Sequence, residues 1–211
     1  MKIIKRVLLI LFCCFLFVVL LFFGYYVIAT KDAVLDEKKL FDYSYNVTVF
    51  DDFGTKIPSS SYIRKQRICL DELPSYVQHA FVDTEDKNFF THHGFDYLRI
   101  AKAFIKNVGA RSFKQGASTI SQQLIKNTHL THEKTLTRKF KEWKLTRQLE
   151  KRYTKNEILE NYLSVIYFGH NCFGLASASQ FYFGKTPATL TLGESCILAG
   201  LVKSPRSESV V

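Results

Sequence analysis

Hydrophobic residues follow two different patterns along this chain. Between residues 7 and 29 they run almost without interruption, whereas beyond residue 73 they recur at the three- and four-residue spacing of an amphipathic helix. At about 1.5 Å of rise per residue, a helix over residues 7–29 crosses the hydrocarbon core of a bilayer, which is about 30 Å thick. The pattern therefore predicts one transmembrane anchor followed by a mainly helical domain.

The residues around the apolar run predict its orientation. Lys2, Lys5 and Arg6 precede it, so the positive-inside rule makes residues 1–6 a cytoplasmic tail. Everything after Thr30 then lies outside the cytoplasmic (inner) membrane, and the chain is a single-pass protein. A cleaved signal peptide is the alternative, but its apolar core spans only about 7–15 residues. The length of the run favours an uncleaved anchor.

Residues 30–72 are predicted to form a stalk and a short β element. The segment Asp51–Gly54 is typical of a hairpin turn. Leu73-Pro74 is predicted to open the globular domain, 73–211, because proline is well tolerated near the start of a helix. The apolar residues that flank the turn are Val47, Val49 and Ile57.

Two helices are predicted between residues 95 and 130. The first closes at Gly109, and the second begins at Ser118 or Thr119, whose hydroxyl groups can cap free N–H groups. The first helix carries an apolar stripe on one face, formed by Leu98, Ala101, Ile105 and Val108.

Three further helices are predicted towards the C-terminus. One spans about 133–151, and the others begin at the capping boxes Thr154-x-x-Glu157 and Thr191-x-x-Glu194. Their apolar positions are Leu136, Phe140, Trp143 and Leu149 in the first, Ile158, Leu159, Tyr162, Leu163 and Ile166 in the second, and Ile197, Leu198, Leu201 and Val202 in the third.

Composition narrows the class of partner. The chain has 211 residues, enough for one globular domain beside the anchor, and a formal net charge of +10. A positive outer domain attracts anions, and beyond a membrane anchor an anionic or phosphate-bearing lipid is favoured over nucleic acid. The five cysteines have no spacing that indicates a disulfide framework or a zinc site.

Residues 84–94 combine two carboxylates, two imidazoles and two aromatic rings. Phe89 and Phe90 favour burial, and Glu85, Asp86 and His92 need hydrogen-bond partners if they follow them inward. Burial beside aromatic rings favours the protonated form of a carboxyl group, which lets it exchange protons near neutral pH. The stretch alone leaves two interpretations open, a catalytic carboxylate and a polar turn with two core phenylalanines.

Four motifs occur in order along the domain. They are Glu85-Asp86-x-x-Phe89-x-x-His92-x-Gly94, then Gly116-Ala117-Ser118-Thr119-Ile120-x-Gln122-Gln123-Leu124 with Lys126-Asn127, then Arg138-Lys139-x-x-Glu142, and Lys155-x-x-Ile158-Leu159-Glu160-x-Tyr162-Leu163. The sequence thereby resembles the peptidoglycan glycosyltransferases of glycosyltransferase family 51, over about residues 45–206. That family comprises single-function transglycosylases and the front half of class A penicillin-binding proteins. The resemblance implies a lysozyme-like, mainly helical fold.

The resemblance also implies a reaction and roles for individual residues. The substrate would be lipid II, a disaccharide-pentapeptide on a polyprenyl pyrophosphate, and the growing glycan strand would pass with inversion to the 4-hydroxyl of an incoming sugar. Glu85 would be the general base and Glu142 a second essential carboxylate. Asp86, His92 and Thr119 would orient the base and the sugars, and Phe89 would supply an apolar wall. The groups implied to stabilise the departing pyrophosphate are Gln123, Lys126, Asn127, Arg138 and Lys139.

No protein-bound metal or cofactor is predicted. The imidazoles and carboxylates of residues 84–94 lack the spacing of a helical metal site, which favours a divalent cation held with the substrate pyrophosphate over one held by the protein. His129-x-x-His132 is predicted to lie in a surface loop, and Glu160 to support its helix. The expected partners are lipid II, the glycan strand, the membrane and other cell-wall synthesis proteins, and not nucleic acid.

The chain departs from the family pattern at several places. Ser164 stands where asparagine is usual and Lys102 where arginine is common. Beyond Ser204-Pro205 the family continues to a fifth, Arg-rich motif, whereas this sequence stops at Val211, and it has no Ser-x-x-Lys motif of a transpeptidase. An active polymerase is therefore weighed against an inactive or truncated lipid II-binding scaffold and against a glycan-cleaving enzyme.

Overall fold

The computed structural model describes residues 2–42, 51–53, 55, 66–109, 116–131, 133 and 135–203. Within these residues the chain is mainly helical, as predicted. The helices, in chain order, are α1 (Lys2–Thr30), α2 (Glu37–Leu40), η1 (Leu70–Glu72), α3 (Ser75–Glu85), α4 (Tyr97–Gly109), α5 (Ile120–His129), α6 (Leu136–Arg152), α7 (Lys155–Val165), α8 (Leu175–Phe183), η2 (Pro187–Thr189) and α9 (Leu192–Lys203).

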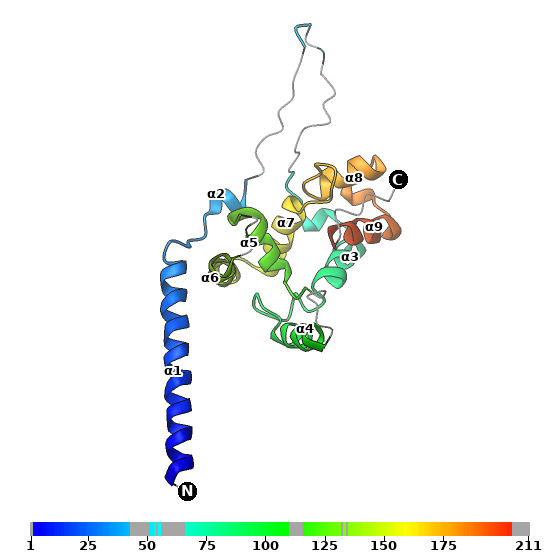
Figure 1. Cartoon of the computed structure of the whole chain (residues 1–211). Coiled ribbons are helices and arrows are strands. Elements are labelled where there is room, and N and C mark those ends of the chain that lie inside the picture. The colour runs from blue at the N-terminus through cyan, green and yellow to red at the C-terminus, as the bar shows by residue number, and fades with distance from the viewer. Residues whose placement is uncertain are drawn as a thin grey trace.

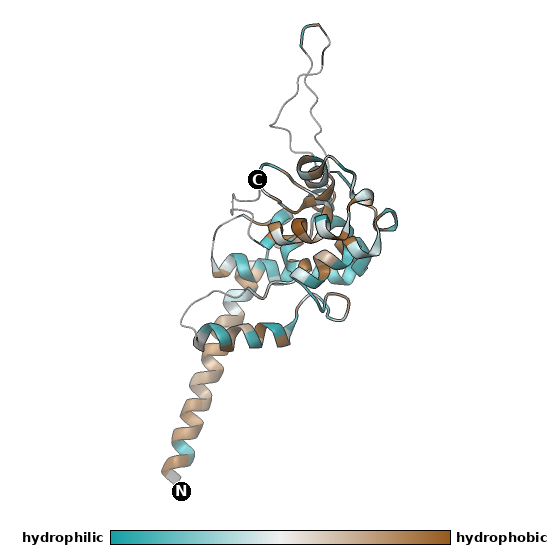
Figure 2. Ribbon diagram, turned by 90° about the vertical axis from the view of Figure 1, so that its right-hand side faces the viewer, coloured by the Kyte–Doolittle hydropathy of each residue, from teal (hydrophilic) through white to brown (hydrophobic). Residues whose placement is uncertain are grey.

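One long helix extends from a body of shorter helices (Figure 1). This helix, α1, is long and apolar enough over Ile3–Thr30 to span a membrane, and Figure 2 shows its hydrophobic colouring over most of its length. In the body, α5 packs against both α6 and α7, and α3 packs against α9. The predicted face of α7 is confirmed, because Ile158, Leu159, Tyr162 and Leu163 are completely buried.

The predicted apolar stripe of α4 exists, but it does not face the core. Leu98 is 74% exposed and Ile105 is 70% exposed, and Tyr97 and Phe104 are exposed beside them. Periodicity reports that one face of a helix is apolar and does not report what covers that face. In α6 the predicted stripe is buried only in part, because Leu136 is 66% exposed and Trp143 is 42% exposed, whereas Leu149 is completely buried.

The predicted β element is not confirmed. The part of the chain that the structure describes contains no strand, and Val47, Val49 and Ile57 lie outside that part. The turn between them is seen in part, because the Asp51 N–H donates to the Thr55 carbonyl at 2.9 Å. The Asp51 carboxylate also accepts the N–H groups of Phe53 and Thr55.

The end of α1 is attached to α6 by polar and aromatic contacts. The hydroxyl groups of Tyr25 and Thr137 lie 2.6 Å apart, and the rings of Tyr25 and Tyr26 meet Phe140 edge to face. Just beyond, the Lys144 ammonium donates to the Thr30 carbonyl at 2.7 Å. The C-terminal end of α1 is therefore held against α6 of the body.

His129 joins α5 to Asp36, the residue that caps α2, so its predicted placement in a surface loop is wrong. It is the last residue of α5 and is half-buried. Its Nε2 lies 3.1 Å from both the N and the O of Asp36, and its Nδ1 lies 2.7 Å from Thr128 Oγ1. Burial lowers the pKa of this imidazole, which favours the neutral ring in these contacts. His132 lies outside the described residues.

Candidate active site

Glu85 is the last residue of α3, and its side chain points towards α5. The Gln123 Nε2 amide donates to Glu85 Oε2 at 2.7 Å. Glu85 Oε1 is buried and has no hydrogen-bond partner among the described residues. One carboxylate oxygen is therefore held in place while the other keeps its lone pairs, which is the arrangement that a proton acceptor needs.

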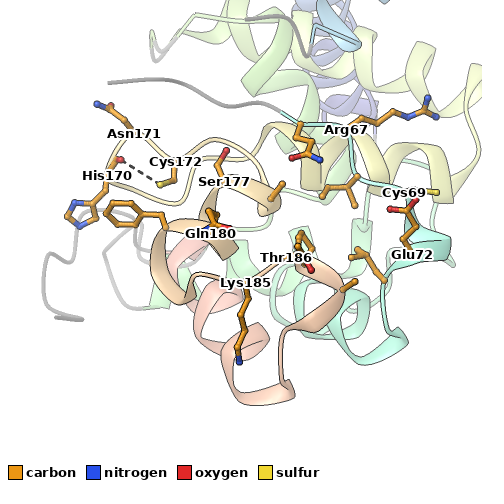
Figure 3. A pocket seen from close by; sticks show the side chains of 17 residues that line it. Arg67, Cys69, Glu72, His170, Asn171, Cys172, Ser177, Gln180, Lys185 and Thr186 are labelled. Carbon is orange, nitrogen blue, oxygen red and sulfur yellow. Dashed lines mark hydrogen bonds between the residues drawn. The ribbon is translucent and has the colours of Figure 1, made fainter. Parts of the chain in front are cut away.

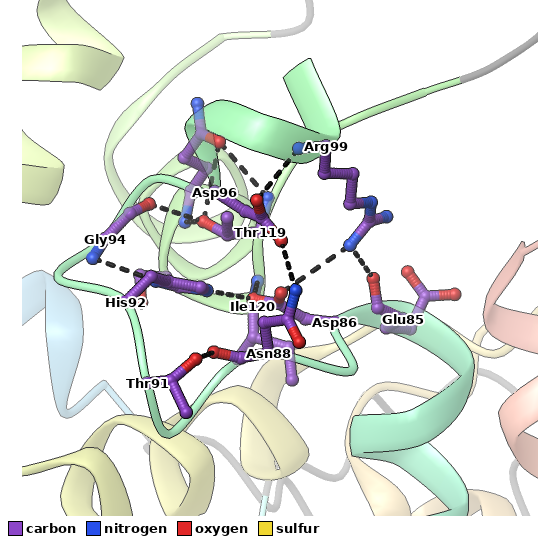
Figure 4. A network of polar contacts seen from close by, with 12 residues as sticks. Glu85, Asp86, Asn88, Thr91, His92, Gly94, Asp96, Arg99, Thr119 and Ile120 are labelled. Atoms are coloured by element: carbon purple, nitrogen blue, oxygen red, sulfur yellow. Dashed lines mark hydrogen bonds and ion pairs between the residues drawn. The ribbon is translucent and has the colours of Figure 1, made fainter. Parts of the chain in front are cut away.

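Asp86 is buried beside Glu85 and joins the first motif to α5 (Figure 4). Its Oδ2 accepts a bond from the Ile120 N–H at 3.0 Å and lies 2.9 Å from His92 Nε2. The Gly94 N–H donates to His92 Nδ1 at 3.1 Å. His92 therefore accepts at Nδ1 and donates from Nε2 to Asp86. Asp86 and His92 therefore contact each other directly, and both residues position the loop that follows Glu85.

Gly94 and Thr119 close this loop onto α5. Gly94 has φ +90°, which strains any residue with a side chain, and a Cβ there would also lie close to Thr146 Cγ2, at 3.0 Å, and to Glu150 Cγ, at 3.1 Å. The Thr119 hydroxyl donates to the Gly94 carbonyl at 2.7 Å. Thr119 also caps α5 in a capping box with Gln122, as its spacing allows. The hydroxyl group of Thr119 is thus used within the protein, in bonds to the Gly94 carbonyl and to Gln122.

The second carboxylate, Glu142, is buried on α6 among donors. Arg138 NH1 lies 3.3 Å from its Oε2, Lys139 Nζ pairs with its Oε1, and the Gln122 amide donates to Oε1 at 2.9 Å. The two cations are only partly covered, because the Arg138 side chain is 20% exposed and that of Lys139 is 43% exposed. They can neutralise Glu142 and still present charge to a bound anion.

Gln122 and Gln123 are consecutive residues near the start of α5, and each holds one of the two carboxylates. Gln122 binds Glu142 and Gln123 binds Glu85. The structure therefore brings together the predicted base, the second carboxylate and two of the predicted cations around one helix end. A proton acceptor on one side and an anion-binding cluster on the other suit displacement of an anionic leaving group by a hydroxyl group.

Other predicted site residues lie less close to this centre. Lys126 and Asn127 are exposed one turn further along α5. Phe89 is completely buried, edge-on to Phe90, and the Lys155 ammonium lies 4.5 Å from its ring centroid. Phe89 thus packs the loop and stacks against a cation. Glu160 accepts the Leu70 N–H at 3.0 Å, in agreement with a supporting role.

Sequence reasoning missed several residues of the polar network. Asp96 accepts the Arg99 N–H at 2.8 Å and the Asn88 amide at 2.8 Å. The first of these bonds is the main reason why the pKa of Asp96 is lowered. An Asp just before a helix is a cap signal, so Asp96 could have been found. The Arg99 side chain carries no such signal, because it reaches back to Glu85.

Tyr162 of the fourth motif lies next to the predicted base. Its hydroxyl donates to Gln123 Oε1 at 3.4 Å, behind the amide that binds Glu85. Complete burial, followed by the charges of Glu85 and Asp86, raises the pKa of Tyr162 well above its ordinary value. Tyr162 is therefore a neutral donor in the wall of the site.

The departure at residue 164 is accommodated by the fold. Ser164 is buried, accepts the Ile68 N–H at 2.9 Å and donates to the Glu160 carbonyl at 2.6 Å. Serine therefore satisfies its local backbone partner here. Lys102, the other departure, is exposed on α4.

A cavity of about 710 Å³ lies elsewhere, between η1, α8 and η2 (Figure 3). None of the predicted site residues lines it; its wall includes Arg67, Glu72, His170, Gln180 and Lys185. The described residues include no group of three His, Cys, Asp or Glu side chains that could hold a metal ion. The chemistry of the motifs is therefore found at the start of α5 and not in this cavity.

Comparison with known proteins agrees with the motifs. Residues 54–211 match the family model described as "Transglycosylase". Penicillin-binding protein 1F of Bacillus subtilis is 37% identical over 195 residues, which are 92% of this chain and 26% of that protein. Penicillin-binding protein 1A of Vibrio cholerae is 38% identical over 207 residues, which are 97% of this chain and 25% of that protein.

Penicillin-binding protein 1A/1B of Bacillus subtilis is 40% identical over 178 residues, or 84% of this chain and 19% of that protein. The chain thus spans about a quarter or less of the length of these relatives. The family match covers most of the chain, including all four motifs and the residues around Glu85 and Glu142. The chain therefore belongs to the transglycosylase family.

Proposed function

We propose that the protein is a peptidoglycan glycosyltransferase that polymerises lipid II into glycan strands. The observation that carries this proposal is Glu85, whose Oε2 is fixed by Gln123 while its Oε1 is buried without a partner among the described residues. Such a carboxylate can accept a proton from a sugar hydroxyl group that enters the site. The family to which the chain belongs supports the same assignment.

The proposed reaction uses the two sides of the site differently. Glu85 removes the proton of the acceptor 4-hydroxyl while the oxygen of that hydroxyl group forms a bond to C1 of the donor sugar. The bond from C1 to the pyrophosphate breaks on the opposite face, and the pyrophosphate leaves with the electron pair, so the configuration at C1 is inverted. Arg138 and Lys139 are placed to stabilise the negative charge that develops there.

A lipid-borne substrate also suits the outer surface of the protein. The helix α1 can anchor the chain in a membrane, with the N-terminus inside and the body outside. The helix α4, whose apolar side chains are exposed, lies on the side of the body from which α1 extends (Figure 1). We propose that this side rests on the bilayer, so that lipid II reaches the site without leaving the membrane. A divalent cation would arrive with the substrate pyrophosphate.

The test is polymerisation of labelled lipid II by the full chain in proteoliposomes. Glu85→Gln should lower the rate by about 10²–10⁴-fold, the usual contribution of a general base, because the amide cannot take the proton. Asp83→Asn, two residues earlier on the exposed surface of α3, is the matched control and should leave the rate unchanged.

Three other outcomes would contradict the proposal. Equal rates for the wild type and Glu85→Gln would exclude Glu85 as the base. Binding of lipid II without any product would indicate a scaffold, and cleavage of finished glycan would indicate a hydrolase. We also propose that the protein binds other cell-wall synthesis proteins. Binding of such proteins to the membrane-anchored chain would be measured separately from polymerisation.

A further inference from the structure

We propose that Arg99 is a positioning residue for the base, and this proposal rests on the proposed function. The Arg99 NH1 group donates to the Glu85 backbone carbonyl at 2.6 Å and lies 3.6 Å from Asp86 Oδ1 (Figure 4). One guanidinium group therefore contacts both consecutive acidic residues of the first motif. It contacts the backbone of Glu85 and leaves the carboxylate of Glu85 to the acceptor.

The root of the Arg99 side chain is also fixed. The backbone N–H of Arg99 donates to Asp96 Oδ1 at 2.8 Å, and Asp96 Oδ2 accepts the Asn88 side-chain amide at 2.8 Å. Asn88 itself lies in the loop between Glu85 and Gly94. The start of α4, this loop and the end of α3 thus form one hydrogen-bonded unit, and Arg99 is its only side chain that reaches Glu85 in the described contacts.

Electrostatics explains why a cation is needed at this point. The carbonyl groups at the C-terminal end of α3 carry partial negative charge, and Glu85 and Asp86 add two carboxylates there. Asp86 Oδ1 is buried and makes no hydrogen bond among the described residues, so the Arg99 charge at 3.6 Å is what compensates it. Without Arg99, the end of α3 is expected to turn so that these groups reach water.

Such a turn would move the reacting atom. The Glu85 carboxylate is aligned by Gln123 from a different helix, so a shift of the Glu85 backbone pulls the carboxylate away from that amide. A displacement of about 1 Å can cost about 100-fold in rate when it spoils the geometry of attack. Arg99 thus acts on the rate of the chemical step and not on substrate binding.

Lys102 provides a matched comparison on the same helix. It lies three positions further along α4, carries the same charge and is exposed. Arg99→Ala should lower kcat about 10–100-fold with KM changed less than about twofold, whereas Lys102→Ala should change neither. Arg99→Lys, which keeps the charge but offers a different shape, should fall between Arg99→Ala and the wild type.

A small cation should restore part of the lost activity. The Arg99 side chain is 33% exposed, so its removal leaves a site that solvent can reach. Guanidinium chloride far below denaturing concentration should raise kcat of Arg99→Ala several-fold, and sodium chloride at equal ionic strength should not. Glu85→Gln should show no such rescue. A general loss of packing would not respond to guanidinium.

Amide hydrogen exchange tests the role of Arg99 without a measurement of catalytic activity. Amides of residues 82–89 should exchange faster in Arg99→Ala than in the wild type, with Lys102→Ala as the control. If the wild type made no polymer, the proposed function would fail, and this exchange measurement would still decide on the contact itself. The proposal is overturned if exchange is unchanged, if KM rises while kcat is retained, or if Arg99→Ala is as active as Lys102→Ala.

Discussion

Two adjacent amides hold two carboxylates that come from different helices. Gln122 donates to Glu142 on α6 and Gln123 donates to Glu85 on α3, so two consecutive residues in the first turn of α5 hold both carboxylates. Gln122 is also part of the capping box with Thr119. The Gln122 side chain therefore both caps the helix and holds Glu142.

Tyr162 leads to a prediction about alkaline pH. Its folded-state pKa lies well above its ordinary value, about 10, because burial disfavours the phenolate. The stability that depends on the neutral phenol is therefore fully present below pH of about 10 and is lost as the pH rises towards the folded-state pKa. Tyr162→Phe cannot ionise, so its unfolding free energy should fall less than that of the wild type at high pH.

Urea unfolding of the full chain in detergent, followed by circular dichroism at pH 8 and pH 10.5, measures this difference. At pH 8 the two chains should agree within about 1 kcal/mol, since only one long hydrogen bond is lost. Parallel declines for both chains would contradict the assignment. Tyr182, whose pKa is also raised by burial, is present in both chains and cancels in the comparison.

At the scale of elements, the ends of helices are encoded locally. The Thr154 hydroxyl accepts the Glu157 N–H, and the Glu157 carboxylate accepts the Thr154 N–H at 2.7 Å, so α7 begins at the predicted capping box. The bonds from Thr154 lower the pKa of Glu157, the backbone bond most strongly. The ionised carboxylate thus stabilises the helix start at neutral pH.

Replacing the cap should destabilise the fold in a pH-dependent way. Thr154→Ala should cost about 1 kcal/mol of unfolding free energy at pH 7, and Thr154→Ser should cost little. Because the folded-state pKa of Glu157 is lowered, its contribution is present above a pH of about 4.3 and is lost as the pH falls through the folded-state value. The difference between Thr154→Ala and wild type should therefore shrink in acid. A constant difference in urea unfolding at pH 7 and pH 3.5 would contradict this.

The same locality explains what the sequence could and could not predict. Capping boxes and the stripe of α7 depend on residues a few positions apart, and they were predicted correctly. Arg99 binds a carbonyl 14 positions away, and His129 binds a backbone 93 positions away, so neither contact has a local signal. The apolar stripe of α4 was visible, but its exposure depends on the whole fold. The motifs identified Glu85 and Glu142 only through resemblance to a family.

At the scale of the whole molecule, the position of α4 relative to the membrane can be measured. The chain has a single tryptophan, Trp143, which can be replaced by phenylalanine to give a silent background. In that background Phe104→Trp should be quenched by lipids brominated near the headgroups, because an interfacial helix buries its apolar face about 5–10 Å deep. Phe181→Trp, an exposed position on α8, is the control. Equal quenching at both positions would contradict contact between α4 and the bilayer.

Under the proposed function, the attachment of α1 to α6 would affect how the protein meets its substrate. Because Tyr25 and Tyr26 pack against Phe140, these side chains would set the height of the site above a bilayer that α1 spans. A substrate that shares the bilayer then arrives by diffusion in two dimensions. The rate is governed by the number of substrate molecules per unit of membrane area. Buffer added around the vesicles would leave that number unchanged, and substrate-free lipid mixed into the same bilayer would lower it, so the proposed activity should follow the composition of the membrane and not the surrounding volume.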